Sequence, residues 1–310
     1  MSLKSATKQL VSEFSSRPTV RAGSLIVSVF GDAILPRGGS VWIGSLIRAL
    51  ADFGVNERLV RTSVFRLTKD DWLEAEQVGR RSYYRLSATG ARKFEQATIR
   101  IYGDPRQPWA GDWCLVLLAD LEIETRDTVR KELGWLGFGA ISTSVLAHPS
   151  PDIAEMEATL VRAGIDHQVV VMQGKTLGRK QDAAMRALVH RSWRLDDIDS
   201  HYANFMDQFR AVFRAVQKRR QLDPRLAFQI RTLLIQEYRS ILLRDPLLPG
   251  ELLPEAWNGT AAYQVCRDLY QLVYESADQY LTTEFENADG PLPAASPDFY
   301  SRFGGINKSK

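Results

Sequence analysis

The chain has 310 residues, of which 45% are hydrophobic and 25% charged, the balance of a folded protein of two or three domains. This composition excludes wholesale disorder, and no apolar run approaches the roughly 20 residues that a membrane span needs. The first residues lack the apolar core of a signal peptide. Cys114 and Cys266 are far apart and form no CxxC pair, so we expect neither a disulfide scaffold nor a zinc site, and a cytoplasmic location.

The net charge of +3 is unevenly distributed along the chain. Residues 1–106 carry 17 Lys+Arg against 10 Asp+Glu, a balance of +7, whereas residues 107–310 carry 23 against 27, a balance of −4. Such an asymmetry predicts a head that binds a polyanion, attached to a neutral or acidic body.

The first part of the chain predicts three helices. Residues 1–18 are polar and are expected to be loosely ordered apart from a short helix. The first of the three helices begins at Thr19 or Arg21 and ends before the Pro-Arg-Gly-Gly turn at residues 36–39. Apolar residues at positions 43, 46, 47 and 50 have the spacing of a half-buried helix. Gly54 can end that helix, and Asn56 can cap the third one, expected over residues 57–70.

Two short strand-like runs follow the third helix, at residues 72–78 and 82–86. Gly79-Arg80-Arg81 joins them, which predicts a hairpin with a basic turn. Ser87 can then cap a helix that extends to residue 102.

The remaining two thirds of the chain change from alternating to helical patterns. Strand, helix, strand, helix and strand alternate over residues 113–172, an order that fits a small ferredoxin-like α+β unit. Long helices follow at residues 200–220, 226–243 and 261–282, and the tail from Asn287 is expected to be mobile. The fold class is therefore α+β multidomain, with expected domains at residues 19–104, 109–178 and 181–286.

Three helices followed by a basic hairpin have the order of a winged helix-turn-helix DNA-binding domain. At 100° per residue, the third helix places Val60, Val64 and Leu67 on one side and cations with hydroxyls on the other. Guanidinium groups on such a face can pair with guanine edges, and the hairpin turn can reach phosphate. Phe65 falls on the presumed DNA face, where it is out of place unless it packs under the hairpin. The candidate DNA-binding residues are Arg58, Arg61, Thr62, Ser63, Arg66, Lys69, Arg80, Arg81 and Tyr83.

Several strings of residues are long and unusual enough to suggest a family. They include Ser28-Val29-Phe30-Gly31-Asp32, the run from Gly54 to Leu67, Gly79-Arg80-Arg81-Ser82-Tyr83-Tyr84-Arg85-Leu86, and Leu243-Arg244-Asp245-Pro246. These strings resemble the PaaX family, transcriptional repressors of phenylacetic acid degradation operons. The resemblance implies a dimeric repressor that phenylacetyl-coenzyme A releases from its operator. The middle unit also resembles the ferredoxin-like fold of Cas2-type nucleases.

An effector of this kind is a large anion with an apolar end, so its pocket needs cations and apolar or aromatic walls. The region that offers both holds the candidates Arg231, Tyr238, Arg239, Arg244 and Trp257. Ion pairs that order the Pro-rich bend are an alternative role for these arginines. Apolar stripes on the C-terminal helices predict a dimer interface there, as operator readers usually dimerise.

An enzymatic function is the alternative. In it, the head binds nucleic acid and the middle unit cleaves it in a metal-dependent reaction that uses Asp120. No carboxylate cluster, phosphate-binding loop or histidine spacing accompanies Asp120, so we expect no enzyme activity, no catalytic residue, no metal and no cofactor.

Overall fold

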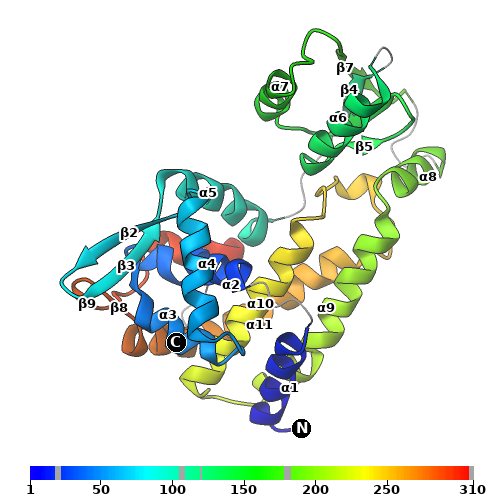
Figure 1. Cartoon of the computed structure of the whole chain (residues 1–310). Coiled ribbons are helices and arrows are strands. Elements are labelled where there is room, and N and C mark those ends of the chain that lie inside the picture. The colour runs from blue at the N-terminus through cyan, green and yellow to red at the C-terminus, as the bar shows by residue number, and fades with distance from the viewer. Residues whose placement is uncertain (18–21, 105–108, 119–120, 178–182, 307–310) are drawn as a thin grey trace. The chain divides into compact units, whose positions relative to one another are not determined.

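The computed structural model describes residues 1–17, 22–104, 109–118, 121–177 and 183–306, without the side chain of Gln96. The chain divides into two compact bodies (Figure 1). The first consists of residues 1–104, 204–240 and 262–310, and the second of residues 105–203 and 241–261. This grouping cuts across the three consecutive domains expected from the sequence, because the N-terminal third shares a body with most of the C-terminal helices.

The N-terminal third of the first body contains the expected helices and hairpin. Its elements are α1 (Leu3–Ser15), α2 (Ala22–Val29), the π-helix η1 (Phe30–Ile34), the 3-10 helix η2 (Leu35–Arg37), β1 (Ser40–Trp42), α3 (Ile43–Ala51), α4 (Glu57–Lys69), β2 (Leu73–Val78), β3 (Arg81–Leu86) and α5 (Ala88–Tyr102). The three strands form an antiparallel sheet in the order β1-β3-β2. The expected caps are present: Asn56 accepts a hydrogen bond from Leu59 N at 2.9 Å, and Ser87 accepts one from Gly90 N at 2.9 Å.

The N-terminal segment is more ordered than its polar composition suggested. Helix α1 spans 13 residues and buries an apolar face formed by Leu3, Leu10 and Phe14. The Phe14 ring meets the Phe53 ring edge to face, with 6.4 Å between centroids. The helix expected in this segment is therefore present, and it is held in place because its apolar face has a partner.

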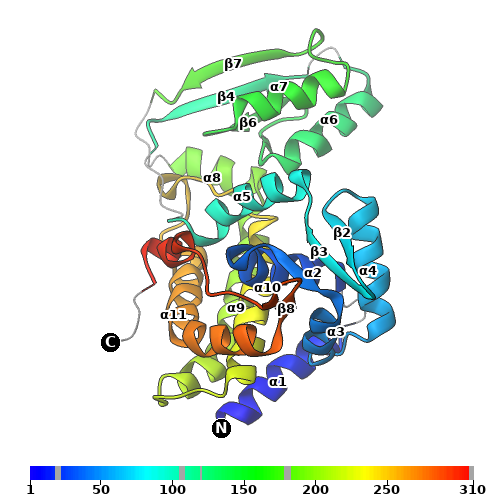
Figure 2. The same cartoon turned by 90° about the vertical axis from the view of Figure 1, so that its left-hand side faces the viewer.

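The second body contains a four-stranded antiparallel sheet. Its elements are β4 (Asp112–Leu117), α6 (Ile123–Trp135), β5 (Gly139–Ala140), β6 (Val145–His148), α7 (Ile153–Arg162), β7 (Val170–Lys175) and α8 (Ala183–Ser192). The strand order β5-β6-β4-β7, with helices after the first and third strands, is ferredoxin-like, as expected. The structure has four strands where the sequence predicted three, because the segment between α6 and α7 forms two strands, β5 and β6. Helices α6 and α7 lie along one face of this sheet (Figure 2). Val129 and Leu133 of α6 and Met156 and Leu160 of α7 share a buried core with Val116 of β4.

The C-terminal part is helical, as expected. It contains α9 (Leu195–Val216), α10 (Pro224–Leu242), the 3-10 helix η3 (Gly250–Leu252), α11 (Asn258–Glu284), the short strands β8 (Glu286–Asn287) and β9 (Gly290–Pro291), and the helix η4 (Pro297–Gly304). No helix in the described ranges is long and apolar enough to cross a membrane.

Two expectations about the C-terminal part need correction. The apolar stripes that suggested a dimer interface are largely internal, because Phe205, Phe209 and Val212 of α9 and Leu269 and Val273 of α11 are all buried within the chain. The tail beyond residue 287, expected to be mobile, also packs as far as residue 306. Its buried side chains are Leu292, Phe299, Arg302, Phe303 and Ile306.

A buried ionic network joins the N-terminal third to α10 and η4. Asp32 lies in the π-helical turn η1 and accepts hydrogen bonds from Arg231 Nε at 2.7 Å and Arg302 Nη1 at 2.9 Å. The hydroxyls of Tyr102 and Tyr270 donate to the same carboxylate at 2.7 and 2.8 Å. Because every member of this network is buried, it fixes the N-terminal helices against the C-terminal ones.

Candidate nucleic-acid interface

Helix α4 separates its apolar and cationic faces as the sequence predicts. Val60 and Val64 are fully buried against α2 and α3. The opposite side is exposed and carries most of the candidate DNA-binding side chains. These are Arg58, Arg61, Thr62, Arg66 and Lys69. Glu57 begins the helix, and Arg66 and Lys69 occupy its last turn, where cations interact favourably with the helix dipole.

The cations of this face differ in whether they are already paired with other residues of the chain. The side chains of Arg58, Arg66 and Lys69 make no ion pair or hydrogen bond with a described residue. Arg61 lies 2.8 Å from Glu57 one turn earlier, in an exposed pair. The Thr62 hydroxyl donates to the Arg58 carbonyl at 2.8 Å. The free cations therefore stand at both ends of the helix.

Phe65 projects from the same face and is 68% exposed. The possibility that it packs under the hairpin is therefore wrong. A large apolar side chain among free cations has no packing role in this body.

Two of the candidate residues are not available for contact. Ser63 is buried beside Val64 on the inner side of α4, and Tyr83 is only 4% exposed on the inner face of the β1-β3-β2 sheet. Both predictions rested on sequence proximity to cations. The periodicity of helix and strand turns these two side chains inward, so we omit them from the interface.

The hairpin turn presents one free and one tethered arginine. Arg80, beside Gly79 at φ +60°, is exposed and has no partner among the described residues. Arg81 forms an ion pair with Glu286 of β8 at 2.6 Å, and its guanidinium carbon lies 4.4 Å from the centre of the Trp42 ring. Hydrogen bonds with Tyr83 and Glu286 raise the pKa of Arg81. Arg81 therefore ties the turn end of the hairpin to β8, a role that its neighbour Arg80 does not share.

The effector candidates are divided between the two bodies. Arg231 is buried, and Asp32 and Asp278 flank it at 2.7 and 2.6 Å. Burial opposes its charge, but these carboxylates hold the pKa of Arg231 well above its usual value. Tyr238 is also buried, at 2% exposed. The expectation of an effector contact is therefore wrong for these two residues, which are part of the core.

The other three effector candidates have different surroundings. Arg239 is half-buried, lies 3.2 Å from the Ser24 hydroxyl, and has its pKa lowered by burial. Arg244 is exposed at 3.2 Å from a ring nitrogen of His201. Trp257 packs edge to face against Tyr202, with 5.7 Å between centroids. Arg239 belongs to the first body, and Arg244 and Trp257 belong to the second.

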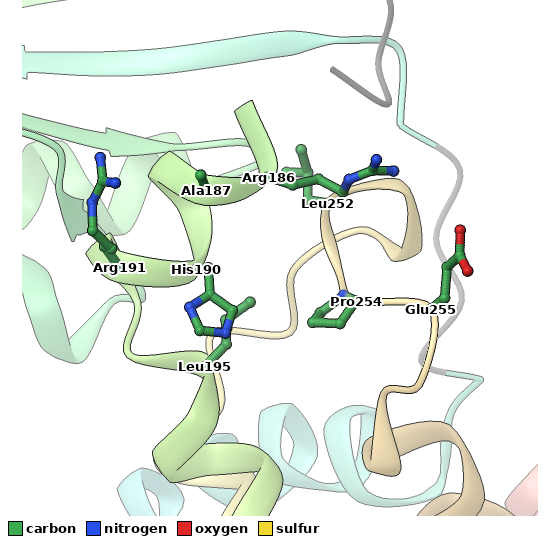
Figure 3. Close-up of a pocket in the computed structure, with 8 residues that line it drawn as sticks. All are labelled: Arg186, Ala187, His190, Arg191, Leu195, Leu252, Pro254 and Glu255. Carbon is green, nitrogen blue, oxygen red and sulfur yellow. The ribbon is translucent and has the colours of Figure 1, made fainter. Parts of the chain in front are cut away.

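The second body contains two cavities that adjoin α8, neither of which the sequence indicated. The first has a volume of about 600 Å³. Figure 3 shows the His190 ring of α8 on one side of it and the Pro254 ring on the other. His190 Nε2 lies 3.1 Å from Asp196, Arg186 and Glu255 give the rim mixed charge, and Arg191 points away from the rings (Figure 3).

The second cavity lies on the face of the sheet that α6 and α7 leave uncovered. Its volume is about 210 Å³, and its walls come from β4, β6, β7, α8 and Trp193. Seven of its lining side chains are apolar or aromatic: Trp113, Leu115, Ile141, Ala147, Met185, Leu188 and Trp193. We call it the aryl pocket. One sequence signal could have found part of its lining. Side chains alternate along β4, which puts Trp113 and Leu115 on the face opposite to Cys114 and Val116.

The described residues contain no group of three or more His, Cys, Asp or Glu side chains that could hold a metal ion. Asp120, on which the nuclease alternative depends, lies outside the described residues.

Three family models match successive parts of the chain. The model for the PaaX-like protein matches residues 21–90, that for the PaaX protein central Cas2-like domain residues 106–186, and that for the PaaX-like protein C-terminal domain residues 193–283. The chain belongs to the PaaX family. Its resemblance to the PaaX strings at residues 28–32, 54–67 and 79–86 is thereby confirmed.

A PaaX-family relative is named for its function. The transcriptional repressor PaaX of Escherichia coli (strain K12) is 39% identical over 289 residues, which cover 93% of this chain and 92% of that protein. It is a regulator and not an enzyme, in agreement with the non-enzymatic function expected from the sequence. An uncharacterized protein of Mycobacterium tuberculosis shares the fold, with a TM-score of 0.55 and 20% identity over 84% of this chain and 99% of the other.

Proposed function

We propose that the protein is a transcriptional repressor that binds operator DNA through a winged helix-turn-helix formed by α2, α3, α4 and the β2-β3 hairpin. The observation that carries the proposal is the exposed face of α4, where Arg58, Arg66 and Lys69 have no partner among the described residues. The order helix, strand, helix, helix, hairpin and the β1-β3-β2 sheet support it. The 39% identity to a named repressor supports it independently.

The positions of these side chains suggest that some contact bases and others contact phosphates. Arg58 stands in the first turn of α4, the part of a recognition helix that approaches base edges in the major groove. A guanidinium there can pair with the O6 and N7 atoms of guanine, and the exposed Phe65 ring can contact a thymine methyl group. Lys69 and the hairpin residue Arg80 are suited to backbone phosphates, which position the protein without reading sequence.

Family membership supports a proposal for the regulated genes and the effector. The operon is one for phenylacetate catabolism. An aryl-acyl-coenzyme A releases the repressor from its operator, and phenylacetyl-coenzyme A is the first candidate. A homodimer matches the two-fold symmetry of operators. The buried residues of the α9 and α11 stripes are not available for its interface, whereas Leu272 of α11 is 44% exposed.

A gel-shift assay of the full chain on the upstream DNA of a phenylacetate gene cluster tests the proposal. We expect a specific shift, which phenylacetyl-coenzyme A abolishes and coenzyme A alone does not. Arg58→Ala should weaken the shift, whereas Arg219→Ala, an equal loss of an exposed charge at the C-terminal side of α9, should not. Equal affinity for operator and unrelated DNA would contradict a repressor function.

A further inference from the structure

The aryl pocket has the size of a single aromatic ring. Its volume of about 210 Å³ exceeds that of a cavity of roughly 150 Å³ that is known to take up benzene. Unlike that enclosed cavity, the pocket is open to solvent on one side, so a ligand can enter it directly. Removal of an apolar ring from water against this mostly apolar lining favours binding.

Two indole rings form rigid walls of the pocket. The Trp113 ring nitrogen donates to the Thr176 hydroxyl at 2.8 Å, and the Trp193 ring nitrogen donates to the Gly137 carbonyl at 2.8 Å. Trp193 also packs so closely over Gly139 that a β-carbon at that position would meet the ring at 2.4 Å. Held in these positions, the rings cannot collapse into the space between the sheet and α8. The cavity is thus preformed, which lowers the cost of binding.

One side of the aryl pocket is polar. Thr176, which follows β7, gives one side of the lining a hydroxyl group. Lys175 also borders the pocket, but it pairs with Asp112 across the sheet, so its side chain points to the face opposite to that of Trp113 and Gly174. The lining as a whole therefore suits a ligand with one aromatic ring and a chain that leaves the pocket on the side of Thr176.

We infer that the aryl pocket binds the aromatic end of the small-molecule effector, with the rest of the ligand leaving the pocket on the side of Thr176. The inference rests on the proposed function for the existence and the class of the effector, and adds its site. The site lies wholly within the second body and involves none of the arginines that the sequence suggested.

Gly174 allows the pocket to be filled without disturbing the fold. It lines the pocket from β7, and its backbone φ is compatible with any residue. A β-carbon there would meet the Leu115 side chain at 3.6 Å, an ordinary van der Waals distance. In Gly174→Ile, the new side chain should therefore occupy the space that the aromatic ring of the ligand would fill. Isoleucine is β-branched and is favoured in strands. Gln173→Ile is the matched control, because neighbouring residues of a strand point to opposite faces.

Calorimetric titration of the full chain without DNA, with phenylacetyl-coenzyme A as the probe, tests the inference. We expect the wild type and Gln173→Ile to bind equally, and Gly174→Ile to bind at least tenfold more weakly. Gly174→Ile should still shift the operator, but the probe should no longer release it. Free coenzyme A should bind weakly and equally to all three proteins.

Two outcomes would overturn the inference. One is unchanged probe affinity in folded Gly174→Ile, and the other is an equal loss in Gln173→Ile. If Gly174→Ile does not fold, Leu188→Trp fills the pocket from the half-buried face of α8, and unchanged affinity in that variant would count in the same way. A failure of the proposed function is distinguishable, because it would appear as absent operator binding in the DNA assay without ligand.

Discussion

One carboxylate, Asp32, pairs with two arginines that the fold has removed from water, Arg231 and Arg302, the first of which also pairs with Asp278. Burial alone would raise the pKa of Asp32, but the charges of Arg231 and Arg302 and the hydrogen bond from Tyr102 hold it below its ordinary value. Removing one partner of a buried ion pair leaves an uncompensated charge, which costs about 3–5 kcal/mol. Asp32 therefore contributes more to stability than an exposed aspartate does.

Asp32→Asn should lower the free energy of unfolding at pH 7 by about 3–5 kcal/mol, measured by urea denaturation. The folded-state pKa of Asp32 is depressed, so its contribution is complete above the unfolded pKa near 4 and declines as the pH falls through the folded value. The difference in the free energy of unfolding between variant and wild type should therefore become smaller only below about pH 4. The control is Asp207→Asn, which breaks an exposed pair with Arg210 and should cost about 1 kcal/mol or less.

Phe65 provides a second prediction at the scale of residues. Phe65→Ser should weaken binding to the operator by about 1–3 kcal/mol, as expected when a residue that touches a base is truncated. Binding to unrelated DNA should be unchanged, because phosphate contacts do not involve this ring. Stability should not fall, since the ring is 68% exposed. Competition gel shifts with specific and non-specific DNA separate these effects, and equal weakening of both would contradict a base-reading role.

At the scale of elements, the sequence was informative where an element is specified locally. Asn56 caps α4 within three residues, and the alternation of Val60 and Val64 with cations shows which side of α4 is buried. The hairpin also lies where its basic turn predicted. Contacts between distant segments left no such signal. Nothing near Arg81 indicates Glu286, which lies 205 residues away, and nothing near Trp113 indicates Trp193.

The two arginines at the turn of the β2-β3 hairpin should affect DNA binding in different ways. Arg80→Ala should weaken operator and unrelated DNA about equally, and should flatten the slope of log affinity against log salt by about 0.9 for each phosphate that the variant no longer neutralises. Glu286→Gln releases Arg81 from its ion pair without removing a cation, so it should leave that slope unchanged. Filter-binding titrations at several salt concentrations measure both variants. An unaltered slope in Arg80→Ala would show that the turn does not contact the DNA backbone.

At the scale of the whole molecule, the elements proposed to bind DNA do not form a body of their own. The N-terminal third is joined to α10 and the C-terminal tail by the Asp32 network and by further pairs. These pairs are Arg17 with Glu237, Asp52 with Arg225, Ser28 with Gln236 and Arg81 with Glu286. The ferredoxin-like unit differs, because its core cluster draws only on residues 114–165.

This difference predicts opposite behaviour for two fragments. A fragment of residues 1–106 loses Arg231 and Arg302 and exposes the apolar surface that packs against α10 and η4. It should therefore show no cooperative thermal transition and bind operator poorly. A fragment of residues 109–177 keeps all of its core cluster and should unfold cooperatively. Calorimetry and circular dichroism of the two fragments measure both outcomes, and a stably folded 1–106 fragment with full operator affinity would show that the C-terminal contacts are dispensable for the DNA-binding fold.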